Sequence, residues 1–372
     1  MHRVAISSTG LFTPPEVITN EELVASFNQF VQLDNEKHAA EIAAGSRTAL
    51  TESNVEFIEK ASGIERRYVL EKSGILDPTR MRPVFKARAD SELSLMAEIG
   101  VKAAQAALQA VGKTAADVDG VICAAANMQR PYPAMAVEIQ TALGVQGYGF
   151  DMNVACSSAT FGIEQAVNAV RCGTARAVLV INPEITSAHH AWMDRDCHFI
   201  FGDVCTATLV ERLDLAPAGS FEVLGTTLFS AFSNNIRNHN GFLSRCEDRD
   251  PQDRDQLFRQ EGRKVFKEVC PMAAEHITGH LGALGLDAAQ VRRFWLHQAN
   301  LSMNQLIIRK VLGRDATREE APVILDEFAN TASAGSIISF HRHHDDVQAG
   351  ELGVICSFGA GYSIGSVIVR RL

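Results

Sequence analysis

Cys156 has the strongest local signature for chemistry in this 372-residue chain. An apolar, strand-like run over 148–154 ends beside it, and a helical pattern follows as far as Gly173. Backbone N–H groups at the start of a helix, together with the helix dipole, favour a thiolate over a thiol. Cys156 is therefore a candidate nucleophile, although a small buried cysteine with no chemical role fits the same local pattern.

Two polar residues in the second half follow predicted strands in the same way. His297 ends a strand predicted over 293–297, and Asn330 follows another short strand. Alone, a histidine there is more often a satisfied strand-end residue, and an asparagine a turn residue. Because α/β sheets place their chemistry beyond the carboxyl ends of strands, we expect both residues to join Cys156 in one site. The glycine-rich run 358–361 could direct backbone N–H groups at a developing oxyanion there.

An internal repeat predicts the architecture. The strand at 119–123 resembles the strand at 293–297, with an offset of 295 − 121 = 174. The run 156–159 matches 331–334, with an offset of 331 − 156 = 175. In both copies a helix, a glycine and a buried strand follow. These nearly equal offsets predict two duplicated α/β halves, each a sheet covered by helices.

We expect the halves to comprise residues 1–185 and 186–372. Two polar stretches of the first half, 34–54 and 71–88, are predicted to be surface insertions near the substrate entrance. A third polar stretch, 234–255, is predicted to be a loop.

Composition narrows the cellular setting. The net charge of −9 argues against a nucleic acid partner. No apolar run reaches the roughly 20 residues of a membrane helix, and the amino terminus lacks a signal-peptide pattern. The eight cysteines include no C-x-x-C pair, and their scatter through apolar segments fits a reducing compartment. We expect a cytoplasmic protein that is not associated with a membrane.

Two patterns invite a cofactor or a metal, and neither is convincing. The glycines of the run 359–365 have the wrong spacing for a dinucleotide-binding loop, and no βαβ unit follows them. The run His341–Asp346 could ligate a metal, but it falls at a predicted helix end, where charged residues are usually solvated. The pair His189-His190 is likewise not interpreted as a metal site. We expect no cofactor and no metal.

The motifs resemble, in order and over essentially the whole chain, those of the β-ketoacyl-acyl-carrier-protein synthase III family of the thiolase superfamily. They are Ala155–Ala159, His297–Asn300, Asn330–Ser333, Phe358–Gly361, Gly63–Arg67 and Phe201–Asp203. The chain looks most similar to a longer branch that uses medium-chain acyl-CoA primers such as octanoyl-CoA. The resemblance implies a thiolase-like fold, in which two halves form a five-layered αβαβα body.

The resemblance also implies a reaction. Cys156 would take the acyl group from acyl-CoA while the N–H groups of Cys156 and Ala360 bind the thioester oxyanion. Malonyl-acyl-carrier protein would then lose CO2, with His297 and Asn330 hydrogen-bonding the thioester oxygen of the enolate. Attack on the acyl-cysteine would release a β-ketoacyl chain. Such enzymes are homodimers, and acyl-CoA and malonyl-acyl-carrier protein are substrates rather than cofactors.

Further positions carry implied binding roles. Arg195 and Phe57 match residues that stack on the CoA adenine. Tyr132 matches an aromatic residue that reaches across the dimer to the floor of the partner's acyl pocket. Phe358, beside Gly359, matches a gating aromatic residue of the substrate site.

A basic patch for the acidic carrier protein is implied by Lys267, Arg309 and Lys310. The chain also departs from the family pattern. Ala61 replaces an arginine that grips a CoA phosphate, with Lys60 beside it as possible compensation, and Ser302 replaces an arginine of the docking patch. Ala329 replaces the usual glycine before Asn330, which would tighten the backbone.

Two other functions fit the same residues. An acyltransferase of this fold could pass the acyl group to an alcohol or an amine without condensation. A scaffold could bind acyl-CoA without catalysis, but binding alone needs no reactive thiol, so the combination of Cys156, His297 and Asn330 argues against it.

Overall fold

One mixed nine-stranded sheet runs through the computed structural model, which describes residues 1–248, 250 and 253–372. The strand order is β11-β12-β13-β8-β1-β7-β6-β4-β5. Two residue pairs, Ala5–Glu222 and Ile6–Phe221, join β1 to β8, so two sheets meet at a short seam. The strands are β1 (Val4–Phe12), β4 (Gly120–Ala124), β5 (Tyr148–Met152), β6 (Ala177–Glu184), β7 (Val204–Arg212), β8 (Phe221–Ser233), β11 (Val291–Leu296), β12 (Leu352–Gly359) and β13 (Gly361–Arg371).

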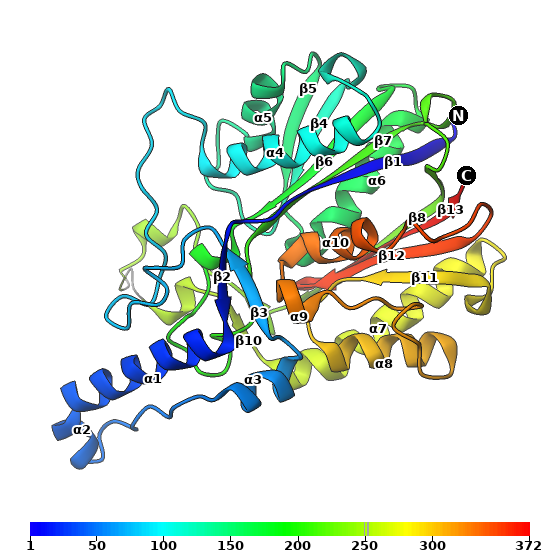
Figure 1. The fold of residues 1–372 in the computed structure, drawn as a ribbon. Helices are drawn as coiled ribbons and strands as arrows, with labels where there is room; N and C mark the ends of the chain where they lie inside the picture. Colours follow the sequence, from blue (N-terminus) through cyan, green and yellow to red (C-terminus); the bar gives the residue numbers. More distant parts are fainter. Residues whose placement is uncertain (249, 251–252) are drawn as a thin grey trace.

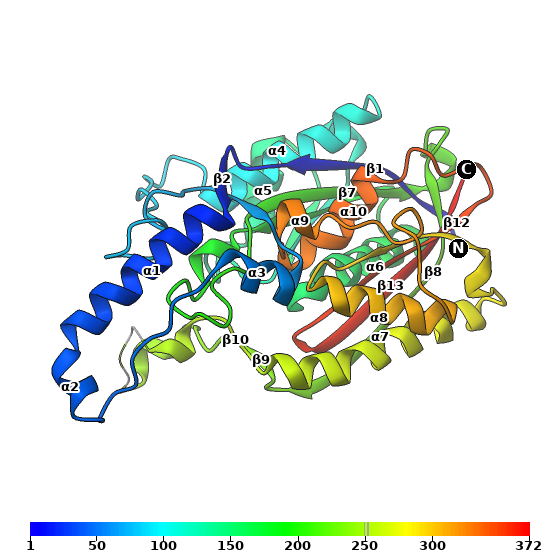
Figure 2. The ribbon, with the colours of Figure 1, turned by 60° about the horizontal axis from the view of Figure 1, so that its bottom comes forward.

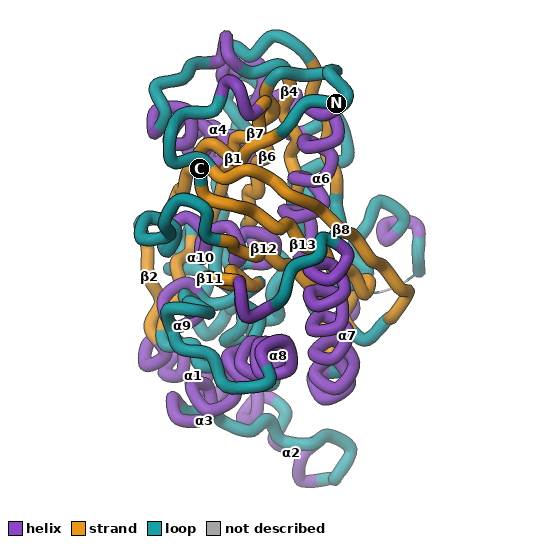
Figure 3. Tube along the Cα trace, turned by 90° about the vertical axis from the view of Figure 1, so that its right-hand side faces the viewer, coloured by secondary structure: helices purple, strands orange, loops and turns teal. Residues whose placement is uncertain are grey.

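Helices cover both sheets and fill the space between them (Figure 3). On the first sheet lie α4 (Leu95–Ala110) and α5 (Met135–Leu143). Between the sheets lie α6 (Ser158–Arg171) and α10 (Gly335–Arg342), and on the second sheet lie α7 (Gly262–Ala283) and α8 (Leu301–Leu312). Separate apolar clusters fill the middle and the two outer interfaces. The expected five αβαβα layers are confirmed.

The two halves contain the same unusual turn. Ala155 and Ala332 both have φ of +47°, a left-handed conformation that is uncommon for alanine. Each donates its N–H at 2.9 Å to the side-chain oxygen of the asparagine two residues earlier, Asn153 or Asn330. A 3-10 turn and a central helix, α6 or α10, follow in each half. The asparagine bond holds the same backbone conformation in both copies.

This shared turn corrects the expected register of the repeat. The residue after the left-handed alanine is Cys156 in the first half and Ser333 in the second, an offset of 333 − 156 = 177. The expected match of Cys156 with Thr331 is therefore wrong by two residues. Runs of serine, alanine and threonine align almost equally well when shifted, whereas backbone conformation distinguishes the registers.

Sheet pairing also bears on the boundary between the halves. β7 follows residue 185, yet it pairs with β6 and β1 of the first sheet. We therefore propose a division between Arg212 and Phe221, where the chain leaves the first sheet and enters the second.

An arm projects from the layered body at the first insertion (Figures 1 and 2). It consists of α1 (Asn20–Lys37), α2 (Ala39–Ala43), an irregular return and α3 (Val55–Ser62). The Thr19 side chain accepts the Glu22 N–H at 3.3 Å, and the Glu22 carboxylate accepts the Thr19 N–H at 3.1 Å. Thr19 is thus the N-cap of α1, the reciprocal arrangement expected of a capping box.

Two short antiparallel ribbons lie outside the large sheet: β2 (Glu16–Thr19) pairs with β3 (Arg66–Val69), and β9 (Ile236–Arg237) pairs with β10 (Arg259–Gln260). The helix α9 (Leu325–Phe328) is a single turn. The second insertion runs through turns and bends to α4. The stretch 234–255, expected to be a loop, contains β9, and its residues 249 and 251–252 lie outside the described part of the chain. Among the described residues, no helix has both the length and the apolar character of a bilayer span.

Candidate active site

Cys156 lies between β5 and α6, in the 3-10 turn Ala155–Ser157. The Ser158 hydroxyl accepts the Val154 N–H at 2.8 Å, and the Ser157 hydroxyl donates to the Ser363 carbonyl of β13 at 2.9 Å. These bonds attach the turn to its own half and to the other half. The cysteine is therefore held at the junction of the two sheets.

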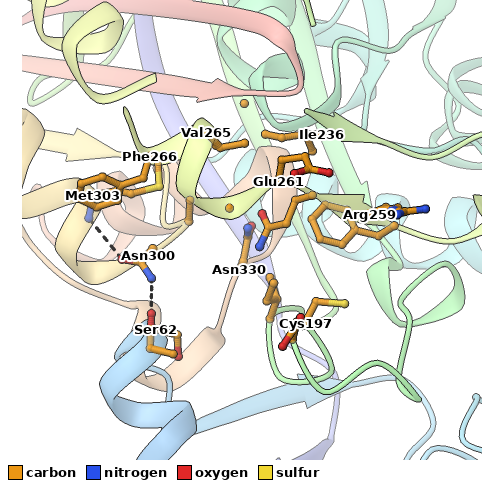
Figure 4. Close-up of a pocket in the computed structure, with 18 of the residues that line it drawn as sticks. Ser62, Cys197, Ile236, Arg259, Glu261, Val265, Phe266, Asn300, Met303 and Asn330 are labelled. Atoms are coloured by element: carbon orange, nitrogen blue, oxygen red, sulfur yellow. Dashed lines mark hydrogen bonds between the residues drawn. The ribbon is translucent and has the colours of Figure 1, made fainter. Parts of the chain in front are cut away.

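A cavity of about 1190 Å³ opens in front of Cys156. His297, Asn330, Phe358 and Gly359 also line it, so the structure brings the three expected reactive side chains into one cavity. The wall includes Ser62 of α3, Val265 and Phe266 of α7, Met303 of α8, and Asn300, the N-cap of α8 (Figure 4).

His297 follows β11 and is almost completely buried, with 1% of its surface exposed. Its backbone N–H donates to the Cys356 carbonyl at 2.8 Å. Its imidazole ring lies edge-on to the Phe358 ring, with the two centroids 5.3 Å apart. Burial lowers the pKa of His297 to about 4, so the imidazole is neutral at pH 7. Its Nδ1 has no hydrogen-bond partner among the described residues. A neutral imidazole offers one N–H donor and one acceptor.

Asn330 follows the short helix α9 and not the expected strand, because the chain closes into a helical turn there. Backbone and side-chain bonds hold Asn330 in place. Its N–H donates to the Ile200 carbonyl at 2.9 Å, and its carbonyl accepts the Gly202 N–H at 3.1 Å. Its side-chain Oδ1 accepts the Ala332 N–H, which leaves the NH2 group as the free donor. Before it, Ala329 has φ of +57°, a conformation that favours glycine. An alanine at position 329 therefore holds a conformation that is strained for a residue with a side chain.

The backbone beside Cys156 contributes two more donors. The backbone N–H groups of Ala360 and Cys156 lie close enough to the thiol to lower its pKa. A Cβ added at Gly359 would lie 2.6 Å from the Cys156 Cβ and 3.1 Å from its Sγ. Glycine at position 359 therefore leaves the space that the sulfur needs.

The thiol is nevertheless protonated at neutral pH. Burial, followed by the negative charge of Glu184, raises the pKa of Cys156 to about 12 despite the two N–H groups. The backbone N–H groups act in the expected direction, towards the thiolate, but burial has the larger effect on the pKa. Partial removal from water costs the thiolate more solvation free energy than two backbone N–H donors restore.

Glu184 is a buried acid that the sequence analysis did not single out. Its carboxylate accepts the N–H groups of Ala126 at 2.9 Å and Ser333 at 3.1 Å, and also the Ser333 hydroxyl. Burial raises the pKa of Glu184 to about 7. The signal available in the sequence was a glutamate that ends the apolar run of β6, where a charge is unusual.

The expected CoA residues lie farther out. Phe57 lines the cavity, and the Arg195 guanidinium lies over the Phe57 ring, 4.1 Å from its centroid. Arg195 Nε also donates to the Glu52 carbonyl at 2.7 Å. The two side chains therefore stack on each other rather than standing apart.

Other expected residues lie on the surface. Tyr132 is 81% exposed and is not part of the cavity wall. The basic residues expected to dock a carrier protein are exposed on α7 (Lys267) and α8 (Arg309 and Lys310). Arg309 pairs with Asp315, which reduces its charge toward a partner.

The histidine-rich run at 341–346 makes structural contacts. His341 Nδ1 lies 2.8 Å from the Thr9 hydroxyl, and Asp346 receives two 2.7 Å bonds from Arg293. Within the described part of the chain, no group of three or more histidine, cysteine or acidic side chains is arranged to hold a metal ion.

Known proteins share this sequence and this fold. Residues 150–230 match the family model of 3-oxoacyl-[acyl-carrier-protein (ACP)] synthase III, and residues 281–371 match the model of its C-terminal part. A beta-ketodecanoyl-[acyl-carrier-protein] synthase of Pseudomonas aeruginosa is 59% identical over 347 residues, which cover 93% of this chain and 99% of that protein. A beta-ketoacyl-[acyl-carrier-protein] synthase III of Bartonella tribocorum is 30% identical over 278 residues, covering 73% of this chain and 83% of that protein.

The fold agrees with these matches. The crystal structure of 3-oxoacyl-(acyl carrier protein) synthase III from Pseudomonas aeruginosa PAO1 superposes with a TM-score of 0.77 at 20% identity, covering 99% of this chain and 98% of that one. The resemblance noted from the motifs is confirmed. This chain belongs to the 3-oxoacyl-[acyl-carrier-protein] synthase III family of condensing acyltransferases.

Proposed function

We propose that this protein condenses a medium-chain acyl-CoA with malonyl-acyl-carrier protein and so initiates fatty acid synthesis. The observation that carries the proposal is the common cavity of Cys156, His297 and Asn330. The name of the 59% identical relative supports the primer length. Its β-ketodecanoyl product has ten carbons, and malonyl condensation adds two, so the primer is octanoyl-CoA.

Cys156 is the proposed nucleophile of the first half-reaction. Its sulfur attacks the thioester carbon of acyl-CoA, and the N–H groups of Cys156 and Ala360 bind the oxyanion. The C–S bond to CoA then breaks, and the thiol proton leaves with the CoA sulfur. Acyl transfer therefore leaves no net charge in the cavity, which suits a site withdrawn from water.

His297 and Asn330 act in the second half-reaction. The C–CO2 bond of malonyl-acyl-carrier protein breaks, and its electron pair moves into the enolate of the thioester. The imidazole N–H and the Asn330 NH2 group donate to the enolate oxygen. The α-carbon then attacks the acyl group on Cys156, the C–S bond to the cysteine breaks, and the released thiolate takes a proton from water. Two neutral donors stabilise the anion without pairing with the malonyl carboxylate, which must depart as neutral CO2.

A second copy of the chain completes the proposed enzyme, which we place in the cytoplasm. β5 lies at an edge of the sheet, and Phe150 on it is 39% exposed. Tyr132, also exposed, precedes α5 near that edge. An apolar sheet edge calls for a covering partner. In such a homodimer Tyr132 would reach the partner's acyl pocket and limit primer length.

The outer residues serve the two pantetheine-linked substrates. We assign Phe57 and Arg195 to the CoA adenine, which would enter between the two side chains after they separate. Phe358 and Gly359 shape the path to the cysteine. The carrier protein docks on the exposed basic residues Lys267, Arg309 and Lys310.

A primer comparison with carboxyl-labelled malonyl-acyl-carrier protein tests the function. We expect release of labelled CO2 coupled to a ten-carbon β-ketoacyl product with octanoyl-CoA, and much slower turnover with acetyl-CoA. Preference for acetyl-CoA would remove the medium-chain assignment. Acyl transfer to another acceptor with malonate untouched would favour the non-condensing acyltransferase.

The role of Cys156 has its own test. Intact-protein mass spectrometry after octanoyl-CoA treatment should show an added acyl group on the wild type and none on Cys156→Ala. A persistent adduct on that variant would remove Cys156 from the role of nucleophile. A wild type that binds octanoyl-CoA but never becomes acylated would favour the scaffold.

A further inference from the structure

Four basic side chains line the cavity in front of Cys156, and all four come from the region around the start of α7. They are Arg254, Arg259, Arg263 and Lys264. The next residues of α7, Val265 and Phe266, also line the cavity, and Val265 is buried (Figure 4). Because Arg263 and Lys264 are exposed, this helix presents apolar residues to the interior and charges to the opening.

Ion pairs neutralise two of these four charges. Arg254 binds the Asp194 carboxylate at 2.5 Å, and Arg259 binds Asp255 at 2.9 Å. Such close pairs have little charge left for a ligand.

No close ion pair neutralises Arg263 or Lys264 among the described residues. Lys264 lies 3.7 Å from Glu261, a loose exposed pair. Arg263 has no ion pair or side-chain hydrogen bond within the described residues. On the wall formed by the end of α3, Ala61 has only a methyl group to offer.

The two proposed substrates share a feature that fits these cations. Acyl-CoA and malonyl-acyl-carrier protein both present a thioester on a pantetheine arm, with phosphate at the far end of that arm. With the thioester at Cys156, the arm fills the cavity and the phosphate lies at the opening. The cavity, at about 1190 Å³, is at the upper end of ordinary ligand pockets and has room for a long arm.

We propose that Arg263 and Lys264 bind the phosphate groups of the pantetheine-linked substrates. The inference rests on the proposed function, because it takes the arm's thioester to be at Cys156. Arg263 offers a planar fork of N–H donors for two phosphate oxygens, and Lys264 adds a mobile point charge. Neighbouring helix positions point about 100° apart, so the two side chains take different oxygens.

The same helix extends this charge outward. Lys267 follows Arg263 by four residues and Lys264 by three, so the three side chains share one face of α7. The proposed phosphate residues are thus continuous with the proposed carrier-docking residue. A carrier protein on that patch would deliver its phosphodiester to Arg263 and Lys264.

Direct binding tests the inference without catalysis. Arg263→Gln, Lys264→Gln and the double variant are titrated with CoA and with pantetheine, which has no phosphate. We expect the double variant to bind CoA about tenfold or more weakly and pantetheine as the wild type does. Raising salt should weaken CoA binding to the wild type more than to the double variant.

Arg171→Gln is the matched control. Arg171 ends α6, roughly 20 Å from the end of that helix beside Cys156. Arg171→Gln should leave the affinities for CoA and for pantetheine unchanged. Arg263→Lys, which keeps the charge but not the fork, should restore part of the lost CoA affinity.

Steady-state kinetics then separate the two sources of phosphate. A raised KM for octanoyl-CoA, for malonyl-acyl-carrier protein or for both, at unchanged kcat, supports the inference and names the substrate served. Equal binding of CoA to the wild type and the double variant overturns it, as does an equal loss with octanoyl-pantetheine. A wild type that binds CoA through these residues but does not condense leaves the inference standing and refutes the proposed function.

Discussion

At the scale of single residues, the cavity pairs a half-buried thiol with neutral hydrogen-bond donors. Desolvation raises the pKa of Cys156 to about 12 and lowers the pKa of His297 to about 4, so both groups are neutral at pH 7. In the proposed reaction, the donors of His297, Asn330 and Ala360 meet only the negative charge that develops on the thioester. In a dry site such donors act strongly, because little solvent screens them.

The protonated thiol predicts a pH profile. Far below a pKa of about 12, the thiolate fraction of Cys156 rises about tenfold per pH unit. Its alkylation by iodoacetamide should therefore rise with that slope from pH 7 to 10, measured by mass spectrometry of the Cys156 peptide. Glu184→Gln removes the nearby carboxylate and should move the profile to lower pH. A plateau below pH 9 would show that the sulfur ionises more easily than its burial allows.

Gly359→Ala tests the close approach beside the sulfur. The added Cβ would lie 2.6 Å from the Cys156 Cβ, so the cysteine or its turn must shift. A displacement of this size predicts a loss of about a hundredfold in the rate of acyl-enzyme formation. The matched control is Gly279→Ala, where an added Cβ meets nothing within 4 Å and acylation should be unchanged. Normal acylation of Gly359→Ala would show that the turn yields easily.

At the scale of elements, tertiary packing overrides local preference in α7. A proline inside a helix favours a break, which the sequence predicts at Pro271, yet α7 runs without interruption from Gly262 to Ala283. The helix continues because the buried positions keep helical spacing on both sides of the proline, at Val265, Val269, Cys270, Ala273, Ala274 and Ile277. The proline removes one hydrogen bond but no part of this face.

Pro271→Ala should therefore stabilise the protein. Restoring the missing N–H and removing the ring clash should raise the free energy of unfolding by about 1–3 kcal/mol. Urea denaturation with a linear extrapolation measures the change, and Gly279→Ala on the same helix gives a benchmark of about 1 kcal/mol. Equal or lower stability would mean that the neighbouring elements have adapted to the proline.

The start of α4 shows the same limit at an element boundary. The amphipathic pattern over 91–111 predicts a helix capped by Asp90 or Ser91, but α4 begins at Leu95 with Ser94 as its N-cap. The Glu138 carboxylate of α5 accepts the Ser94 N–H at 2.6 Å and its hydroxyl at 2.8 Å. A partner 44 residues away in the chain thus selects which serine caps the helix.

At the scale of the whole molecule, buried histidines link stability to pH. Burial lowers the pKa of four of them to about 4: His189, His198, His280 and His297. Between pH 4 and 6.5 the unfolded chain binds more protons at these positions than the folded chain. The free energy of unfolding therefore falls as the pH falls through this range.

Acidification from pH 7 to 5 should thus lower the urea midpoint steadily. The loss should be on the order of several kcal/mol, with each pKa unit worth about 1.4 kcal/mol. Glu184 acts in the opposite direction, because its raised pKa stabilises the fold at low pH and this contribution is lost as the pH rises through 7. One carboxyl offsets only part of the effect of four imidazoles.

His189→Phe is the matched variant for this measurement. The His189 ring lies edge-on to Phe201, and neither of its nitrogens has a partner among the described residues. Phenylalanine keeps the ring and removes the titration, so the dependence of the midpoint on pH should become shallower. A midpoint independent of pH in the wild type would contradict the burial of these rings as neutral groups.

The sequence by itself determined the family of this protein through its short motifs, and that resemblance implied the five layers, while the internal repeat and local periodicity predicted two α/β halves. It also nominated Cys156, His297 and Asn330 from their places after predicted strands. The tertiary structure decided which groups are charged, as the thiol of Cys156 and the acid of Glu184 show. It also decided the offset of 177 between the halves, the stacking of Arg195 on Phe57, and the lack of an ion pair for Arg263 among the residues that the structure describes. Solvation and pairing depend on residues far apart in the chain, and no local pattern contains them.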